Sequence, residues 1–195
     1  MKKIELEKAA EISSGLVVQR FTNRKGLKVE DEPAAKKLYY YTTLKSVEDN
    51  KIDLSLLERV ELEKEVKPNY LLRKGDIIMK LSSPFSAARV DFECENLLVS
   101  SHFAVIRVKD NFDPKYLSFI LNGRYVRNQL NRLVEGGMLS IIKISYLKKV
   151  KIRFRNKDEQ QKYGKLLSLL LRRNELKKRE LELEELIMED ILSNL

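Results

Sequence analysis

Residues 156–195 read NKDEQQKYGKLLSLLLRRNELKKRELELEELIMEDILSNL, and this stretch decides how the rest of the chain is organised. It contains a single glycine, Gly164, and no proline. Most of its residues are Leu, Glu, Lys, Arg and Ile, which lose little free energy on entering a helix. Apolar residues recur at about seven-residue intervals, so the stretch predicts a long helix with a coiled-coil seam. The seam residues that we assign to pairing are Leu166, Leu169, Leu170, Leu176, Leu181, Leu183, Ile187 and Ile191.

The charges of this predicted helix fall into two blocks. Residues 162–179 hold seven basic residues and one acid, whereas residues 180–190 hold six acids and no basic residue. An antiparallel neighbour would bring opposite charges together, and a parallel copy would bring like charges together. We therefore expect an antiparallel helix pair, formed either by two copies of the chain or with a matching helix elsewhere. The alternative is a helix that packs on its own domain and carries incidental charge blocks.

The composition sets the class of protein. A chain of 195 residues with 43% hydrophobic residues has room for one domain of about 150 residues and a helical arm. The sequence predicts one folded domain over residues 1–155 and a spacer or dimerisation arm over 156–195. A single cysteine, Cys94, and no long apolar run predict a cytoplasmic protein without a disulfide, membrane span or cofactor.

The pattern before the arm predicts an α/β domain that is rich in strands. Aromatic, β-branched and other apolar runs, bounded by turn residues, predict strands at several places. A single helix is expected to follow Asp113, with Pro114 in its first turn and Val134 near its end. The predicted strands cover residues 38–43, 97–99, 103–108 and 147–155. Residues 71–79 are expected to form a turn, supplied by Gly75, that runs into a further buried strand.

The positive charge of the chain is concentrated in this domain. The whole chain has a net charge of +9, and residues 1–156 alone carry +10. Residues 115–156 contain ten Lys or Arg residues and one acid, Glu135. A concentrated basic surface is the usual electrostatic feature of a protein that binds nucleic acid.

The sequence contains no convincing catalytic or metal-binding pattern. His102 is the only histidine and Cys94 the only cysteine, which argues against a zinc site and a Ser-His-Asp relay. There is no Gly-rich phosphate loop and no methyl-donor loop. We therefore expect a non-catalytic binding protein.

In its order of motifs the chain resembles one half of a type I restriction–modification specificity (S) subunit. The resemblance is carried by LRKGDII at 72–78, DPKYLSFIL at 113–121, the glycines at 136–137, ISYLKKVKI at 144–152 and DEQQ at 158–161. It implies one target-recognition domain that binds double-stranded DNA, followed by one long helix. It also implies partners, namely methyltransferase subunits and a restriction subunit that translocates DNA.

A half-length chain raises the question of what replaces the second half. In the two-half subunit the helices run antiparallel as a spacer, so we expect two copies of this chain to form an antiparallel homodimer. Such a dimer would direct its partners to a bipartite site with identical, inverted halves. A chain that must join a different half is the alternative within the family.

The predicted DNA contacts fall into two groups. Basic residues on the helix and strand after residue 113 are expected to bind phosphates, whereas polar loop residues are expected to read base edges. The phosphate contacts are Arg124, Arg127, Arg132, Lys143 and Lys151. The base-reading candidates are Thr42, Thr43, Lys45, Lys80, Ser82, Ser83, Arg89, Ser101, His102 and Ser140.

Two other functions also fit part of the pattern. A basic RNA-binding module would explain the charge, but the sequence lacks aromatic RNP strands and a GXXG loop. A non-catalytic coiled-coil adaptor would explain the arm but would leave the basic domain without a role.

Overall fold

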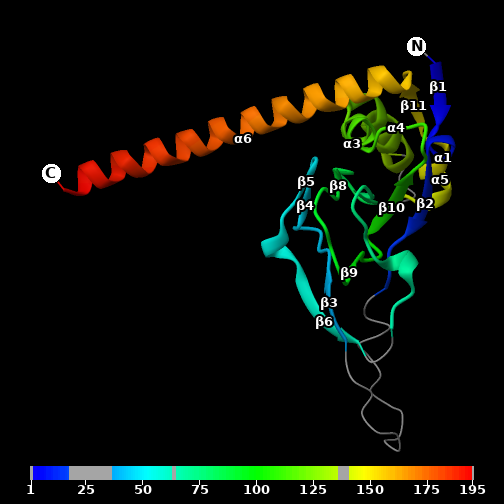
Figure 1. Cartoon of the computed structure of the whole chain (residues 1–195), viewed down its shortest axis with the longest axis horizontal. Coiled ribbons are helices and arrows are strands. Elements are labelled where there is room, and N and C mark those ends of the chain that lie inside the picture. The colour runs from blue at the N-terminus through cyan, green and yellow to red at the C-terminus, as the bar shows by residue number, and fades with distance from the viewer. Residues whose placement is uncertain (1, 18–36, 63–64, 136–140, 195) are drawn as a thin grey trace, which may run out of the picture.

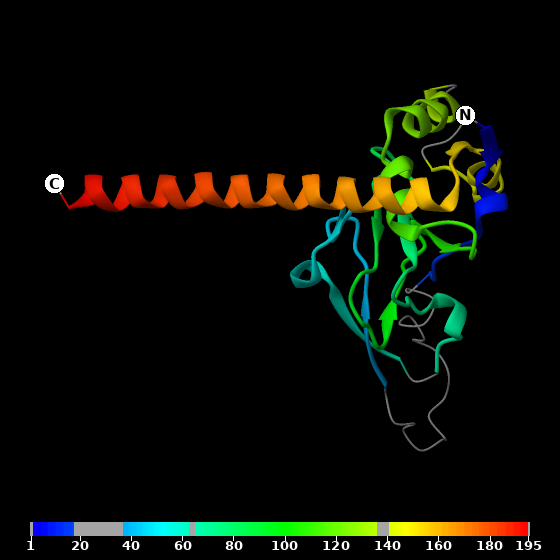
Figure 2. The same ribbon diagram turned by 45° about the horizontal axis from the view of Figure 1, so that its top comes forward.

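The computed structural model describes residues 2–17, 37–62, 65–135 and 141–194. A β-rich body with several short helices lies below one long helix, α6 (Lys157–Ser193), which projects from the body as a straight rod (Figures 1 and 2). The predicted architecture, an α/β body followed by a long C-terminal helix, is confirmed. Among the described helices, none is both long enough and apolar enough to cross a membrane.

An antiparallel sheet forms the centre of the body. Its strand order is β2 (Ala10–Ser14), β10 (Phe103–Val108), β7 (Ile77–Lys80) and β8 (Ala87–Arg89). Alternate residues of a strand point to opposite faces, so β10 contributes to two separate cores. Ala104 and Ile106 pack in one core and Phe103 and Val105 in the other. The sheet is therefore buried on both faces.

A second sheet lies beside the first, in the order β6 (Glu58–Leu62), β3 (Lys37–Tyr41) and β9 (Leu97–Leu98). Strand β3 pairs antiparallel with β6 and parallel with β9. Tyr39 of β3 is fully buried, and its hydroxyl accepts a hydrogen bond from the backbone N–H of Val66. A small hairpin of β4 (Val47–Glu48) and β5 (Lys51–Ile52) extends this part of the body, and 3-10 turns cover Leu54–Leu56 and Pro68–Tyr70.

The two ends of the body are joined by a two-stranded sheet. Strand β1 (Lys2–Glu5) pairs antiparallel with β11 (Lys151–Phe154), and the short helix α1 (Leu6–Ala9) connects β1 to β2. Leu6 of α1 is fully buried, and its backbone N–H donates to the carbonyl of Val150. This pairing brings the beginning of the chain next to the start of α6 (Figure 1).

The predicted single helix after Asp113 is wrong, because the structure has two helices there. Helix α3 (Pro114–Leu121) ends before Asn122, and α4 (Arg124–Glu135) begins after Gly123. The Asn122 side chain bonds both backbone groups of Ala87, accepting from its N–H at 2.8 Å and donating to its carbonyl at 2.7 Å. The Asn122 side chain thus supplies hydrogen-bond partners for backbone groups of the outer strand β8. The helical pattern in the sequence does not reveal this tertiary contact.

The predicted strand over 147–155 begins later than expected. Residues Ile144–Lys149 form the short helix α5, and only Lys151–Phe154 form β11. Within β11 the expected alternation holds, because Ile152 is buried while Lys151 and Arg153 are exposed. Leu147 lies on α5 and packs in the same core as Ala104 and Ile106. Its apolar side chain therefore belongs to a helix and not to the predicted strand.

Helix α6 begins as the sequence predicts and is anchored to α3. Asn156 caps it by accepting a hydrogen bond from the backbone N–H of Glu159 at 2.8 Å. Gln160 and Gly164, one turn apart, are buried on the side that faces α3. A β-carbon on Gly164 would lie 2.9 Å from Asp113 Oδ1, so glycine is what lets the helices approach this closely.

Candidate nucleic-acid interface

Two of the predicted base-reading loops meet in one open pocket. Because β3 and β9 run parallel, the chain leaves both strands at the same edge of the sheet. Thr43 and Lys45 follow β3, and Ser101 and His102 lie between β9 and β10. These residues line a pocket of about 620 Å³. The structure therefore brings together candidates that lie far apart in the sequence.

Within this pocket the candidates differ in their exposure. Lys45 and His102 are exposed, and Thr43 is half-buried with its hydroxyl donating to the carbonyl of Leu56 at 3.1 Å. Thr42 is fully buried, and its Oγ1 accepts a hydrogen bond from the backbone N–H of Ser100 at 3.2 Å. In the structure Thr42 joins the two loops, and the expectation that it reads bases stays a prediction that its burial disfavours.

Arg59 is a further basic residue of the pocket that the sequence reasoning missed. It lies on β6 directly opposite Tyr40, and its guanidinium stands 5.6 Å from the centre of the Tyr40 ring. On the same two strands, the hydroxyl of Tyr41 donates to Glu58, and this hydrogen bond raises the pKa of Tyr41. Recognising 58–62 as a strand paired with the tyrosine-rich strand would have identified Arg59.

A second group of candidates borders the pocket at the turn after β7. The backbone N–H of Leu81 donates to the carbonyl of His102 at 2.9 Å, and its own carbonyl accepts from Ile142 at 2.8 Å. Ser82 is half-buried, and Ser83 is exposed. Lys143, next to Ile142, is exposed as well. The turn therefore links the His102 loop to the segment before α5, and these candidates form one continuous region.

The remaining members of this region have different surroundings. Lys80, at the end of β7, is half-buried, and burial lowers the pKa of its ammonium although Glu48 and Asp49 oppose the effect. The predicted base-reading residue Ser140 lies outside the described residues.

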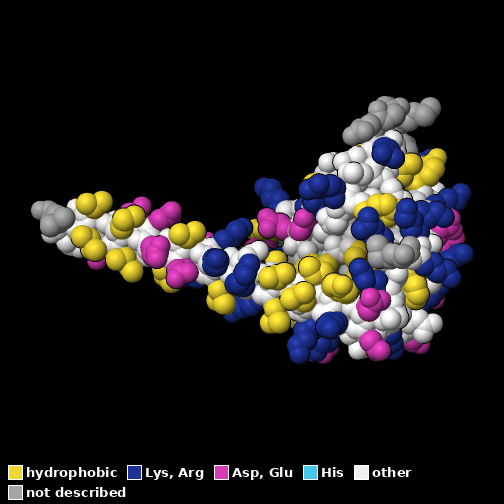
Figure 3. Space-filling model, turned by 90° about the horizontal axis from the view of Figure 1, so that it is seen from above, with side chains coloured by type: hydrophobic (Ala, Val, Ile, Leu, Met, Phe, Trp, Pro, Cys, Tyr) yellow, Lys and Arg dark blue, Asp and Glu magenta, His cyan; other side chains and the backbone are white. Residues whose placement is uncertain are grey.

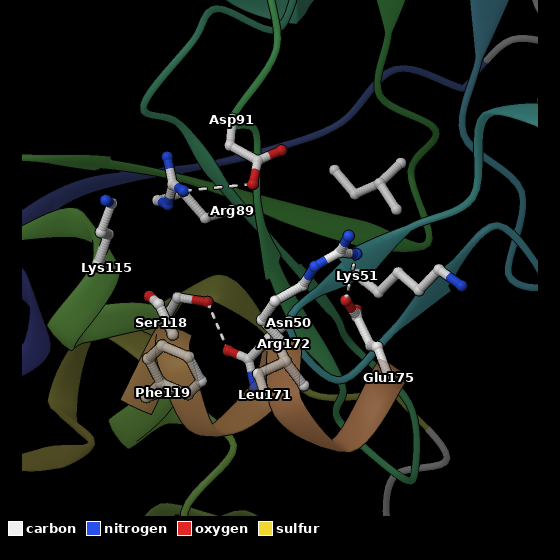
Figure 4. A pocket seen from close by; sticks show the side chains of 12 residues that line it. Asn50, Lys51, Arg89, Asp91, Lys115, Ser118, Phe119, Leu171, Arg172 and Glu175 are labelled. Carbon is white, nitrogen blue, oxygen red and sulfur yellow. Dashed lines mark hydrogen bonds and ion pairs between the residues drawn. The ribbon is translucent and has the colours of Figure 1, made fainter. Parts of the chain in front are cut away.

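Arg89 belongs to a different part of the surface. It lies at the end of β8, where its guanidinium pairs with Asp91 at 3.3 Å. Both residues line a pocket of about 360 Å³ between the β4–β5 hairpin, α3 and α6 (Figure 4). Lys51, Lys115 and Arg172 give this pocket a mainly basic lining. Arg89 thus lies apart from the pocket that contains His102, and lines a pocket with residues of α6.

The predicted phosphate-binding residues also divide into free and paired groups. Arg124 and Arg132 on α4 are exposed. Arg127 is half-buried and forms an ion pair with Asp49. Lys151 pairs with Glu5 at 2.7 Å, and this hydrogen bond lowers the pKa of Glu5. Arg127 and Lys151 therefore already have acidic partners within the body.

Two arginines beside Arg124 strengthen this basic surface. Arg153 and Arg155 line an open pocket of about 600 Å³ together with Arg124. The Arg153 guanidinium lies 4.9 Å from the centre of the Tyr125 ring, and that of Arg155 lies 4.5 Å from the Tyr163 ring. Arg153 and Arg155 belong to the alternating basic residues after Val150, but only Lys151 of this series was predicted to bind phosphate.

The arm presents its predicted seam to solvent. Every apolar residue that the sequence assigned to pairing is exposed in the single chain, with exposed fractions between 38% for Leu170 and 60% for Leu169. Seen from above, Lys and Arg side chains gather on the half of the arm nearer the body, and Asp and Glu side chains lie towards its free end (Figure 3). The first turns pack on α3, as the packed-helix alternative expected, and the rest projects with its apolar residues exposed. The antiparallel pair stays a prediction.

The described part of the chain provides no obvious metal centre. Among these residues there is no group of three or more His, Cys, Asp and Glu side chains that could hold a metal ion. The His102 side chain is exposed on its loop, and Cys94 is half-buried with its thiol directed to the carbonyl of Leu72 at 3.3 Å. The arrangement is that of a polar and basic binding surface.

Comparison with known proteins agrees with this geometry. Residues 20–185 match the family model described as type I restriction modification DNA specificity domain. No curated protein sequence matches the chain significantly.

Solved structures with the same fold are found among the subunits of such systems. The HsdS subunit from Thermoanaerobacter tengcongensis has a TM-score of 0.67 and 17% identity, over 91% of this chain and 44% of the other. A chain from a study of complex assembly and conformational transition of the type I R-M system has a TM-score of 0.64 and 16% identity, with the same coverage of 91% and 44%. The S subunit from M. genitalium has a TM-score of 0.55 and 14% identity, over 93% and 41%. This chain thus spans less than half the length of the structures it matches.

Proposed function

Since the chain belongs to the family of type I restriction modification DNA specificity domains, we propose that it is the DNA-recognition subunit of a type I restriction–modification system. Its task is to bind a defined DNA sequence, and its partners carry out the chemistry. The partners are methyltransferase subunits and a restriction subunit, and the chain itself is not an enzyme. This role requires a position in the cytoplasm, where double-stranded DNA is accessible.

One observation carries the proposal. Three loops that are distant in sequence meet around His102 on a rigid sheet, and they present exposed polar and basic side chains there. Lys45, His102 and Arg59 are suited to donate hydrogen bonds to base edges, as Arg and Lys do to guanine. Rigid support matters because base reading depends on donors held at fixed positions.

Phosphate binding is assigned to a different set of residues. Arg124 and Arg132 are exposed cations on α4, and Lys143 is an exposed cation directly before α5. Such contacts fix the register of the protein on the duplex but carry no sequence information. Arg127 and Lys151 contribute less in this scheme, since each already pairs with an acid of the body.

The proposal extends to the organisation of the chain. Residues 1–155 act as the target-recognition domain, and residues 156–195 act as a spacer that pairs with an antiparallel helix of a second copy. Support comes from the exposed apolar residues of α6 and from its opposite charge blocks. A two-fold dimer of this kind reads two identical half-sites in inverted orientation.

The test is sequencing of modified bases in the source genome, with and without the gene. We expect a methylated, interrupted motif with inverted identical halves that disappears when the gene is deleted. A motif with unlike halves would show that the chain works beside a different recognition domain. Unchanged methylation, together with RNA competing as well as duplex DNA for the purified protein, would overturn the proposal in favour of an RNA-binding module.

A further inference from the structure

A stripe of residues follows one face of α6 with the spacing of a coiled coil. Its members are separated alternately by three and four positions, which keeps them on one side of a slightly underwound helix. The outer members are aromatic, apolar or amide residues, and the central members are charged. In chain order the stripe consists of Tyr163, Leu166, Leu170, Arg173, Lys177, Glu180, Glu184, Ile187, Ile191 and Asn194.

This stripe is exposed to solvent in the single chain, and only its first member, Tyr163, stacks with a residue of the body, Arg155. Gln160 and Gly164 face α3 and are buried, whereas the stripe residues are all exposed. The ion pairs formed within the described part of the arm, Arg172–Glu175 and Arg179–Glu182, use residues outside the stripe. Within the described part of the chain, none of the charged stripe residues forms an ion pair. The stripe therefore offers apolar area and unpaired charge at the same time.

The stripe is complementary to itself when it is reversed. If the midpoint between Lys178 and Arg179 is placed on a two-fold axis, every stripe residue faces another stripe residue. Leu residues then face Ile residues, Tyr163 faces Asn194, and each charge faces an opposite charge. The facing pairs are Tyr163 with Asn194, Leu166 with Ile191, Leu170 with Ile187, Arg173 with Glu184 and Lys177 with Glu180.

We propose that α6 pairs with α6 of a second copy in this one antiparallel register, with the two-fold axis between Lys178 and Arg179. The proposal deepens the proposed function, on whose homodimer it rests, by specifying which residues meet. By symmetry each facing pair occurs twice in the dimer. Arg173 and Glu180, which look like defects in an apolar seam, become the residues that select orientation and register.

Three neighbouring alignments of the same stripe are worse. A parallel pair places Arg173 against Arg173 and Glu184 against Glu184. Shifting the antiparallel pair by one heptad places Arg173 opposite Lys177 in one direction, and Glu180 opposite Glu184 in the other. A shift of one residue places apolar Leu176 opposite Glu180. The charges therefore disfavour the neighbouring arrangements as well as favouring this one.

The register sets the separation of the two DNA-reading bodies. Gly164 packs on the body, and in this register it lies opposite residue 193 of the second copy. At a rise of about 1.5 Å per residue, the two Gly164 positions are about 44 Å apart along the arm. This corresponds to about 13 base pairs at 3.4 Å each, so the reading bodies are held just over one turn of DNA apart.

A charge-swap series in purified full-length protein, without DNA, tests the register. Arg173→Glu creates two facing pairs of like charge in the dimer, and Glu184→Arg does the same. We expect either change to raise the dimer dissociation constant at least about tenfold in sedimentation experiments. The double variant restores both attractive pairs and should return to within about threefold of the unmodified protein. Lys178→Glu and Glu185→Arg, on another face of the helix, carry the same charge changes and should have little effect.

Cysteine crosslinking provides a second readout in a Cys94→Ser background. Leu166→Cys mixed with Ile191→Cys should form a disulfide-linked dimer, whereas either variant alone should not. Self-crosslinking of Leu166→Cys would show parallel pairing and overturn the register. A dimer without the mixed crosslink, or a double charge variant that stays weak, would also overturn it. These results leave the DNA-recognition role untouched, because that role is decided separately by methylation after gene deletion.

Discussion

The buried side chain of Gln160 joins the first turns of α6 to the start of α3. Its Oε1 accepts a hydrogen bond from the backbone N–H of Asp113 at 2.9 Å, and its amide donates to the carbonyl of Arg155 at 2.8 Å. Asp113 in turn caps α3 by accepting from the N–H of Tyr116 at 2.8 Å. These bonds hold the first turns of α6 against the start of α3.

Replacing Gln160 with leucine removes this connection. Gln160→Leu leaves the N–H of Asp113 without its partner, so we expect the free energy of unfolding to fall by about 1–3 kcal/mol. Urea unfolding followed by circular dichroism measures the change. Gln161→Leu is the matched control, because Gln161 is exposed on the same helix and should change stability little. Equal effects of the two substitutions would contradict the assigned role of Gln160.

Asn122 should be equally important for the break between α3 and α4. Asn122→Ala leaves both backbone groups of Ala87 on strand β8 without partners, and we expect a loss of about 1–3 kcal/mol in unfolding free energy. Asn128→Ala, at an exposed position of α4, should be close to neutral or slightly stabilising, since alanine favours the helix. Thermal unfolding of both variants measures the difference, and a neutral Asn122→Ala would show that β8 does not depend on this contact.

Two residues of the pocket around His102 should affect different properties, one the choice of DNA sequence and the other the stability of the fold. Arg59→Ala should relax discrimination at one base position by about 1–3 kcal/mol, because it removes an exposed donor that can bond a base edge. Competition binding against single-base variants of the target measures this loss.

Thr42→Val is the counterpart of that variant. It removes the acceptor of the Ser100 N–H inside the protein and should lower stability by about 1–3 kcal/mol without changing which bases are preferred. A change in base preference with Thr42→Val, and none with Arg59→Ala, would reverse these assignments.

Salt dependence distinguishes free from paired arginines. Arg132 is exposed on α4, so Arg132→Ala should weaken binding to all DNA sequences and flatten the logarithmic salt dependence by about one unit. Arg127→Ala should change that slope less, since Arg127 already pairs with Asp49. Titrations at several salt concentrations on specific and unrelated duplexes measure both effects. If Arg127→Ala changed the recognised sequence, its assignment as a phosphate contact would be wrong.

Local patterns identified the elements whose structure is determined mainly by the residues within them. The aromatic run at 38–41, the turn at Gly75 before a buried strand and the helix-forming composition after Asn156 all folded as expected. The start of α6 was also predictable, because a capping Asn and two acids mark its first turn. Arg153 and Arg155 could have been selected from the alternation that pointed to Lys151.

Other features depend on contacts that no local pattern records. The apolar pattern of a helix continues past Asn122, although the Asn122–Gly123 pair is itself a local signal for a helix end. The bond from Asn122 to Ala87 is the part that the local pattern does not record. Thr42 and Lys45 have similar polar neighbours in sequence, yet one is buried beneath the second loop and the other is exposed. Arg127 and Arg132 lie on the same helix, and only the position of Asp49 on a distant hairpin distinguishes them.

By itself, the sequence determined a basic strand-rich body, a long C-terminal helix and the reversed order of charges along that helix. These properties follow from propensity, periodicity and charge, which act over a few residues or along one element. The tertiary structure decided which loops meet around His102, which cations remain free and which face of α6 is left exposed. These outcomes depend on strand pairing and side-chain packing between residues far apart in the chain, where a single contact determines whether a polar group reaches solvent.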